Sequence, residues 1–187
     1  YNEVPEQIIL DIDDTDDPTH GQQEQTVFNA YYGEHCYLPL HIYEGKTGKL
    51  ILALLRPGQR PTGKQIRSIL KRLVPYLKAA WPEVKIFLRA DSHFSAPEVH
   101  TFCNSAGVYF VLGQTGNPVL KEKAACLLQT AKALFAQQED KSQTIRLFTQ
   151  FDYKADSWDI PLRVVTKVEV SQKGDNLRFV VTNLQSS

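Results

Sequence analysis

The stretch QIILDIDDTDD, residues 7–17, decides how the rest of the chain is interpreted, because an apolar run leads directly into five aspartates. A buried strand that ends in clustered carboxylates is costly to fold, since the charges repel one another and lose hydration. A divalent cation with oxygen ligands offsets such a cost. Asp11 and Asp13 are two positions apart, so they share one face of a strand. The stretch therefore predicts a cation site at a strand end, and the plainer alternative is a solvated acidic turn after an edge strand.

The composition is that of an ordinary globular protein of 187 residues, with 42% hydrophobic and 22% charged residues. This length fits one domain with room for an insertion. The formal net charge is zero, from 21 basic and 21 acidic residues. Any contact with nucleic acid therefore needs a local basic surface or a metal, because there is no global positive field.

Three features set expectations about the setting of the protein. The cysteines, Cys36, Cys103 and Cys126, form no CxxC pair, which argues against a zinc site and a disulfide framework and fits a cytosolic protein. No apolar run approaches the roughly 20 residues that span a bilayer, so we expect no membrane contact. The chain lacks methionine, begins at Tyr1 and ends in polar residues at Ser187, which we interpret as an excised fragment.

The expected elements follow the order β-β-β-α-β-α-β-α and then strands alone, as the hydrophobic periodicity indicates. Strands are expected at 7–13, 35–44, 49–55, 84–90, 108–112, 144–153, 160–170 and 177–182, helices at 62–81, 95–107 and 117–138, and a long polar loop at 14–34. This order matches an α/β, ribonuclease-H-like mixed sheet, in which the first strand is central and the fourth is its parallel neighbour. We expect a catalytic core at 1–140 and a β-rich insertion at 141–187.

Asp13 and Asp91 would end neighbouring parallel strands at one edge of this sheet. Such strands lie about 4.8 Å apart, so the two carboxylates could share a metal. Two-metal phosphoryl transfer needs carboxylates on rigid elements, holding cations roughly 3.5–4 Å apart. A third acid usually joins them. Glu98 is better explained by a capping box with Ser95 at the start of a helix, and Glu169 lies in the middle of a strand.

Several segments together resemble the group-1 DDE transposases of bacterial insertion sequences: LDIDDTDDPTHGQQEQ, YYGEHCYLPLHIY, LRADSHFSAPEV, YFVLGQTGN, RVVTKVEV and RFVVTNL. The resemblance implies a ribonuclease-H-like core with a β-rich insertion and a two-metal site for Mg²⁺ or Mn²⁺. It also implies cleavage and joining of DNA at transposon terminal inverted repeats, a dimer or larger assembly on DNA, and the bacterial cytoplasm.

The same resemblance assigns roles to particular positions. The first catalytic aspartate falls in the segment 11–15, where we place it at Asp13, and the second falls on Asp91. The third acid of the family, a glutamate on a helix after the insertion, has no counterpart before Ser187, so the fragment is expected to be incomplete and inactive. Asp11 and His93 are candidate supporting residues, and His93 stands where glycine is more common.

Two other functions remain open. The segment DIDDT, residues 11–15, also satisfies the Asp-x-Asp-x-Thr signature of haloacid-dehalogenase-like phosphatases, with Asp11 as nucleophile and Asp13 as general acid/base. The long loop and hairpin after the first strand argue against that fold. The third possibility is a non-catalytic transposase remnant that at most binds DNA. Candidate DNA contacts, each of which a solvated surface explains as well, are Lys64, Arg67, Lys71, Arg163, Lys167 and Arg178.

Overall fold

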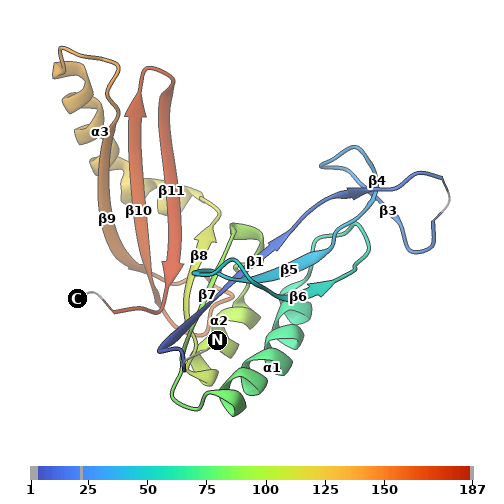
Figure 1. The fold of residues 1–187 in the computed structure, drawn as a ribbon. Helices are drawn as coiled ribbons and strands as arrows, with labels where there is room; N and C mark the ends of the chain where they lie inside the picture. The colour runs from blue at the N-terminus through green and yellow to red at the C-terminus, as the bar shows by residue number, and fades with distance from the viewer. Residues whose placement is uncertain (1–3, 22, 186–187) are drawn as a thin grey trace.

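Strand β1 (Gln7–Asp14) is an interior strand of a mixed sheet in the computed structural model, which describes residues 4–21 and 23–185 (Figure 1). It pairs antiparallel with β5 (Leu40–Glu44) and parallel with β7 (Lys85–Ala90). The sheet order is β6-β5-β1-β7-β8-β11-β10-β9. The remaining strands are β6 (Leu50–Leu54), β8 (Tyr109–Gln114), β9 (Ile145–Tyr153), β10 (Leu162–Ser171) and β11 (Gly174–Thr182). The predicted ribonuclease-H-like mixed sheet with a β-rich end is confirmed.

Three long helices connect these strands: α1 (Gly63–Ala80), α2 (Pro97–Ala106) and α3 (Pro118–Gln137). Thr62 and Gln65 form a capping box at the start of α1, and the Asn117 side chain caps α3. The capping box predicted from Ser95 and Glu98 is wrong. The N-cap of α2 is Ala96, which makes no side-chain cap, because the hydroxyl of Ser95 is engaged elsewhere.

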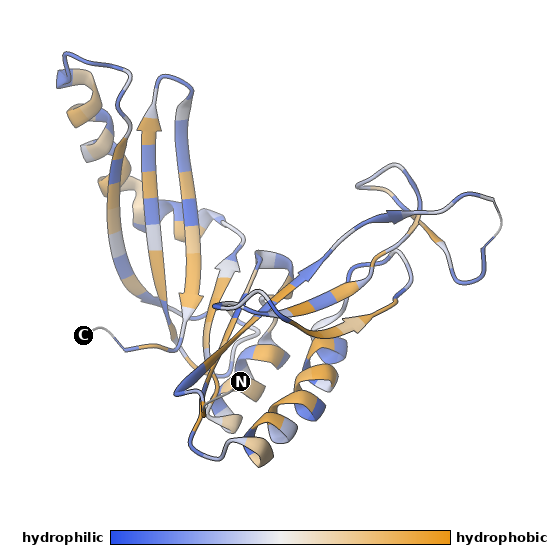
Figure 2. Cartoon of the chain, in the orientation of Figure 1, coloured by the Kyte–Doolittle hydropathy of each residue, from blue (hydrophilic) through white to orange (hydrophobic). Residues whose placement is uncertain are grey.

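One face of the sheet carries the core, and the opposite face is open. In β1 the buried residues are Ile8, Leu10 and Ile12, and the intervening side chains are partly or fully exposed. Cross-strand partners point to the same face, so the register carries this alternation through β7 and β8 into β11 and β10. The alternating hydropathy along the strands is visible in Figure 2. Helices α1 and α2 cover the core face, and α3 packs on β9 and β10.

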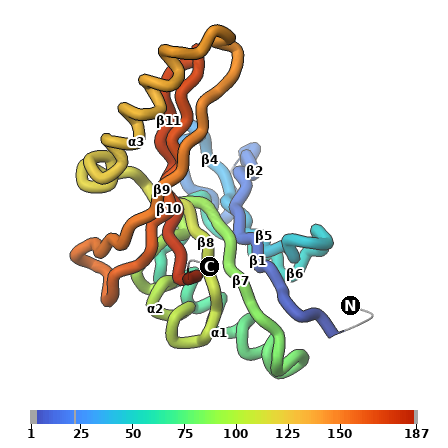
Figure 3. Tube along the Cα trace, turned by 90° about the vertical axis from the view of Figure 1, so that its left-hand side faces the viewer, coloured from blue at the N-terminus to red at the C-terminus, as the bar shows by residue number. Residues whose placement is uncertain are grey.

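The β-rich end continues the main sheet. Strand β11 pairs antiparallel with β8, with Val181 opposite Leu112. Figure 3 shows β9, β10, β11 and α3 rising together from the body that holds α1 and α2. Lysine and arginine side chains on β10 and β11 therefore lie on the same sheet as the ends of β7 and β8. The boundary between residues 140 and 141 stays a prediction.

The described part of residues 15–37, a segment that we name the arm, projects from the body (Figure 1). The prediction of a long loop here is wrong, since the arm contains a second, three-stranded sheet of β2 (Asp17–Pro18), β4 (Glu34–Tyr37) and β3 (Val27–Asn29). These strands are too short and too polar to show a period of two. No helix among the described residues is long and apolar enough to cross a bilayer.

His100 is a titratable group within the core. Its ring is 3% exposed and stacks on Phe110 at 5.3 Å between centroids, with Trp158 edge-on at 5.1 Å. Nε2 lies 3.0 Å from Oγ of Ser95, whose hydroxyl donates to Gln114 at 3.2 Å. Nε2–H is therefore the donor to Ser95, and Nδ1 has no partner among the described residues. Burial lowers the pKa of His100 to about 4.

We expect this histidine to make the fold sensitive to acid. The unfolded chain takes up a proton near its ordinary pKa of about 6.5, whereas the folded chain does not until the pH approaches 4. Stability is therefore lost as the pH falls through this window, by about 2 kcal/mol between roughly pH 7 and pH 5. Urea unfolding at both pH values should show this loss in the wild type and a smaller one in His100→Phe and His100→Gln. Equal pH dependence in all three proteins would contradict the assignment.

Candidate active site

Asp13 and Asp91 come to one edge of the sheet through the pairing of β1 with β7. The last Cα pair of that parallel ladder is Ile12 with Ala90, so the two aspartates are the next residues of adjacent strands. Neighbouring strands lie about 4.8 Å apart. Both aspartates are exposed, and an oxygen of Asp13 accepts the backbone N–H of Asp14 at 2.9 Å. Two exposed carboxylates therefore lie at the ends of adjacent parallel strands, Asp13 as the next-to-last residue of β1 and Asp91 directly after β7.

Asp11, two residues before Asp13 on the open face, is already occupied. Arg89 lies directly across the ladder and binds it through both oxygens, with Nε at 2.6 Å and Nη2 at 2.5 Å. The hydrogen bonds from Arg89 to Asp11 raise the pKa of the guanidinium. A carboxylate held at both oxygens by arginine is a poor nucleophile, because its lone pairs are engaged and its charge is neutralised. In this geometry Asp11 is engaged by Arg89 at both oxygens.

Asp14 and His93 form a second pair beside the two aspartates. Nε2 of His93 lies 3.1 Å from Oδ2 of Asp14, whose side chain is 6% exposed. His93 belongs to the short 3₁₀ helix η1 (Ser92–Phe94) that directly follows Asp91. The contact therefore ties the turn after Asp91 to the end of β1. The sequence predicts Asp14 at the start of a long polar loop. That prediction missed the contact with His93, since the two residues are 79 positions apart.

The end of β8 approaches the Asp91 turn closely, and glycine makes this possible. A Cβ atom on Gly113 would lie 2.7 Å from the backbone nitrogen of Ser92 and 3.2 Å from the carbonyl carbon of Asp91. A pocket of about 490 Å³ opens beside this contact, and its lining includes Asp91, Arg89 and Arg178. The pocket combines the exposed carboxylate of Asp91 with the guanidinium of Arg178, beside the Arg89 that Asp11 holds, and a guanidinium is suited to an anionic ligand.

The cations predicted to touch DNA fall on two sides of the sheet. Lys167 of β10 lies directly opposite Arg178 of β11, and Arg163 lies on the same face. Lys64, Arg67 and Lys71 lie instead on α1, which covers the core face, and Arg67 lines a pocket with Glu98 and Asp159. The structure therefore places Arg178 in the same pocket lining as Asp91 and the α1 cations elsewhere.

Glu169 does not supply the missing third acid. It accepts from Arg146 at 3.0 Å and from Lys167 at 3.1 Å, and these hydrogen bonds lower the pKa of its carboxyl. Within residues 4–21 and 23–185, no group of three or more His, Cys, Asp or Glu side chains is placed to hold a metal ion. The two exposed aspartates offer the oxygen donors that Mg²⁺ and Mn²⁺ prefer. Asp13 and Asp91 thus provide suitable ligand atoms for such a cation, but the third acidic ligand is missing among the described residues.

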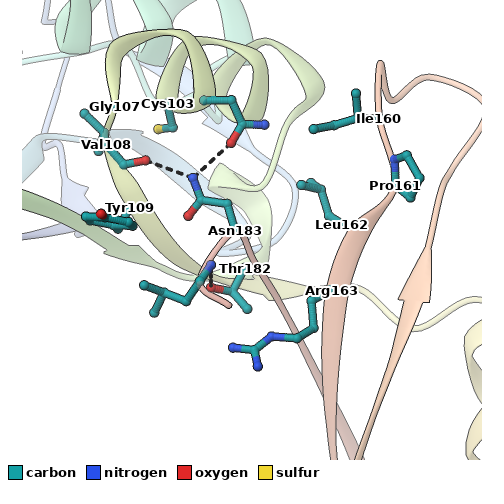
Figure 4. A pocket seen from close by; sticks show the side chains of 12 residues that line it. Cys103, Gly107, Val108, Tyr109, Ile160, Pro161, Leu162, Arg163, Thr182 and Asn183 are labelled. Atoms are coloured by element: carbon teal, nitrogen blue, oxygen red, sulfur yellow. Dashed lines mark hydrogen bonds between the residues drawn. The ribbon is translucent and has the colours of Figure 1, made fainter. Parts of the chain in front are cut away.

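A second pocket, of about 440 Å³, lies at the opposite end of β8 (Figure 4). Asn183 fills part of it and donates to Asn104 at 2.9 Å and to the carbonyl of Val108 at 3.0 Å. Cys103 also lines it, and burial raises the pKa of that thiol to about 12. A thiol that stays protonated at neutral pH is a weak nucleophile. This pocket has no titratable group suited to catalysis and is apart from the aspartates.

The close approach of Gly113 gives a test of the Asp91 turn. In Gly113→Ala the added methyl must displace backbone atoms of Asp91 and Ser92, which should cost about 1–3 kcal/mol of stability and weaken Mn²⁺ binding by the aspartates. Urea unfolding and Mn²⁺-induced broadening of NMR resonances measure the two effects. Gly107→Ala is the matched control, because its φ of 63° makes alanine destabilising at a site at the other end of β8. Unchanged Mn²⁺ binding in Gly113→Ala would contradict the proposed coupling.

Comparison with known proteins bears directly on this geometry. A family model described as "Transposase DDE domain group 1" matches residues 1–187. No curated protein gives a significant match. The match covers the whole chain, including both aspartates and the β-rich end. It confirms the resemblance inferred from the sequence motifs: the chain belongs to the group-1 DDE transposase domain family.

Proposed function

We propose that this chain forms part of the catalytic core of a DNA transposase, and that the intact core cleaves and joins DNA strands by metal-assisted phosphoryl transfer. The observation that carries the proposal is the register of β1 with β7, which makes Asp13 and Asp91 the next residues of adjacent strands. When bound, Mg²⁺ or Mn²⁺ supplies Lewis-acid stabilisation of the phosphate and activation of the attacking water or 3′-hydroxyl. Asp13 and Asp91 would hold it.

The neighbouring residues would position these ligands. Arg89 holds Asp11 at both oxygens, so this carboxylate does not compete for the cation. His93 fixes the turn that carries Asp91 through its contact with Asp14. Rigid placement of this kind lowers the reorganisation that the reaction requires. Because the described residues offer no third acidic ligand beside the aspartates, we propose that residues 1–187 alone bind the cation weakly and do not cleave DNA.

The open face offers a path for the DNA backbone next to the aspartates. Arg178 lines the pocket at Asp91, and Lys167 lies opposite it on β10. Guanidinium and ammonium groups in such a row bind phosphates and place a duplex without reading its sequence. We propose that DNA carrying the transposon terminal inverted repeats enters here. Lys64, Arg67 and Lys71 on α1 form a separate candidate surface.

The phosphatase alternative has less support. Asp11 would have to act as nucleophile while Arg89 occupies both of its oxygens. In addition, β1 is followed by the arm and then by the antiparallel strand β5, whereas phosphatases with this signature follow it with parallel strands and helices. The non-catalytic alternative differs from our proposal in one respect: a remnant would bind DNA without binding the cation at the aspartates.

Cation binding tests the site directly. We expect Mn²⁺ to broaden the NMR resonances of residues at the ends of β1 and β7, and Asp13→Asn and Asp91→Asn each to weaken this binding by about tenfold or more, since each removes a charged ligand. Asp11→Asn should have little effect because Arg89 occupies that carboxylate. Asp156→Asn, at an exposed aspartate in the β9–β10 connection, is the control.

Two outcomes would decide against the proposed site. If Asp13→Asn bound Mn²⁺ as the wild type does, the shared site would be wrong. If Asp11→Asn alone abolished binding, and also abolished hydrolysis of a generic phosphomonoester, the phosphatase alternative would be correct. DNA binding without detectable cation binding in the wild type would support the non-catalytic remnant.

DNA binding by the open face is tested through its salt dependence. Arg178→Ala should weaken binding to duplex DNA of any sequence and lower the slope of log affinity against log salt by about one, because one phosphate contact is lost. Fluorescence anisotropy over a series of salt concentrations measures both quantities. Lys71→Ala, which removes one cation from α1, is the comparison. A loss confined to Lys71→Ala would move the DNA surface to α1 and contradict the open-face path.

A further inference from the structure

The zero net charge conceals a sharp division of charge along the chain. The arm, residues 15–37, contains four acidic residues and no lysine or arginine. Residues 46–80, which include β6 and α1, contain nine lysines and arginines and no acidic residue. Surfaces of opposite sign on one chain attract each other between two copies, and such attraction steers association.

The arm presents aromatic side chains to solvent in a fixed arrangement. Phe28, Tyr31 and Tyr32 are 55%, 77% and 37% exposed. The arm is held at its side by the loop after β6, where the Asn29 amide donates to the carbonyl of Gly58 at 2.7 Å. Exposed tyrosine and phenylalanine are the residues that most often anchor protein interfaces. Because the three strands of the arm are already paired with one another, little entropy of these strands would be lost on docking.

An apolar groove of about 590 Å³ lies between β6 and α1, on the basic part of the chain. Strand β6 is the edge of the large sheet, and natural proteins usually cover or charge an apolar edge. Leu55 and Tyr76 in the lining are 71% and 74% exposed. Arg56 and Arg72 belong to the same lining. The groove thus combines apolar surface for aromatic rings with cations for acidic neighbours.

We propose that the arm of one copy docks in the β6–α1 groove of a second copy, in a reciprocal dimer. The aromatic side chains of the arm fill the groove, and its acidic residues face Arg56 and Arg72. A nucleic acid matches the charge of the groove and not its apolar lining, whereas the arm matches both. The dimer depends on neither the cation nor catalysis, so its test is separate from that of the proposed function.

Sedimentation equilibrium of the whole chain tests the proposal with one variant on each side. Tyr31→Ser removes an arm anchor, and Arg72→Glu reverses a charge in the groove. Each should weaken dimerisation by about tenfold or more, since both reciprocal contacts lose the same group. Thermal unfolding of each variant checks that the fold is kept.

Two matched controls separate docking from general surface effects. Phe148→Ser removes an aromatic side chain that is 63% exposed on β9, and Lys71→Glu reverses the charge next to Arg72 outside the groove lining. Both should dimerise as the wild type does. A monomeric wild type at high micromolar concentration would overturn the proposal, as would a dimer that neither Tyr31→Ser nor Arg72→Glu weakens. A monomer whose DNA binding Arg72→Glu abolishes would also overturn it.

Discussion

The parallel register of β1 with β7 is the constraint on which the candidate site depends. Ile8, Leu10 and Ile12 point into the core, so their burial fixes which face of β1 carries the carboxylates. A slip of one residue would turn every side chain to the other face. Asp11 and Asp13 would then be buried without partners, at a cost of several kcal/mol. The hydrophobic core thus sets the position of Asp13, one of the two proposed cation ligands.

The charges at this strand end are not left to repel one another. Asp11 is neutralised by Arg89 through two hydrogen bonds, and Asp14 is paired with His93. Each of these contacts joins β1 to the segment that ends in Asp91 or follows it. The pair of Arg89 with Asp11 therefore reduces repulsion, and both pairs hold the turn in place. Asp13 remains as the exposed carboxylate of β1 next to Asp91, which is why the site has the character of a cation site rather than an ion-pair network.

The sequence predicted the elements that have a clear period and missed those that depend on distant partners. The long helices and the strands of the main sheet follow directly from hydrophobic spacing. The strands of the arm have two to four residues each, too few for alternation to be recognised. The cap expected at Ser95 failed because its hydroxyl bonds His100 and Gln114 instead. No local sequence pattern predicts the contact between Asp14 and His93, because only the sheet topology brings these two residues together.

The pairing of β11 with β8 changes what the β-rich end can do. If this end were joined to the core only by flexible connections, its cations could take any position relative to the aspartates. In the structure, Val180 lies opposite Gly113, and Gly113 itself touches the turn after Asp91. Arg178 is two residues from Val180 on the same strand, so a continuous hydrogen-bonded sheet fixes its place beside Asp91. The insertion is thereby an extension of the surface that carries the proposed catalytic residues, and a substrate bound along β10 and β11 would be aligned with the aspartates without a hinge between them.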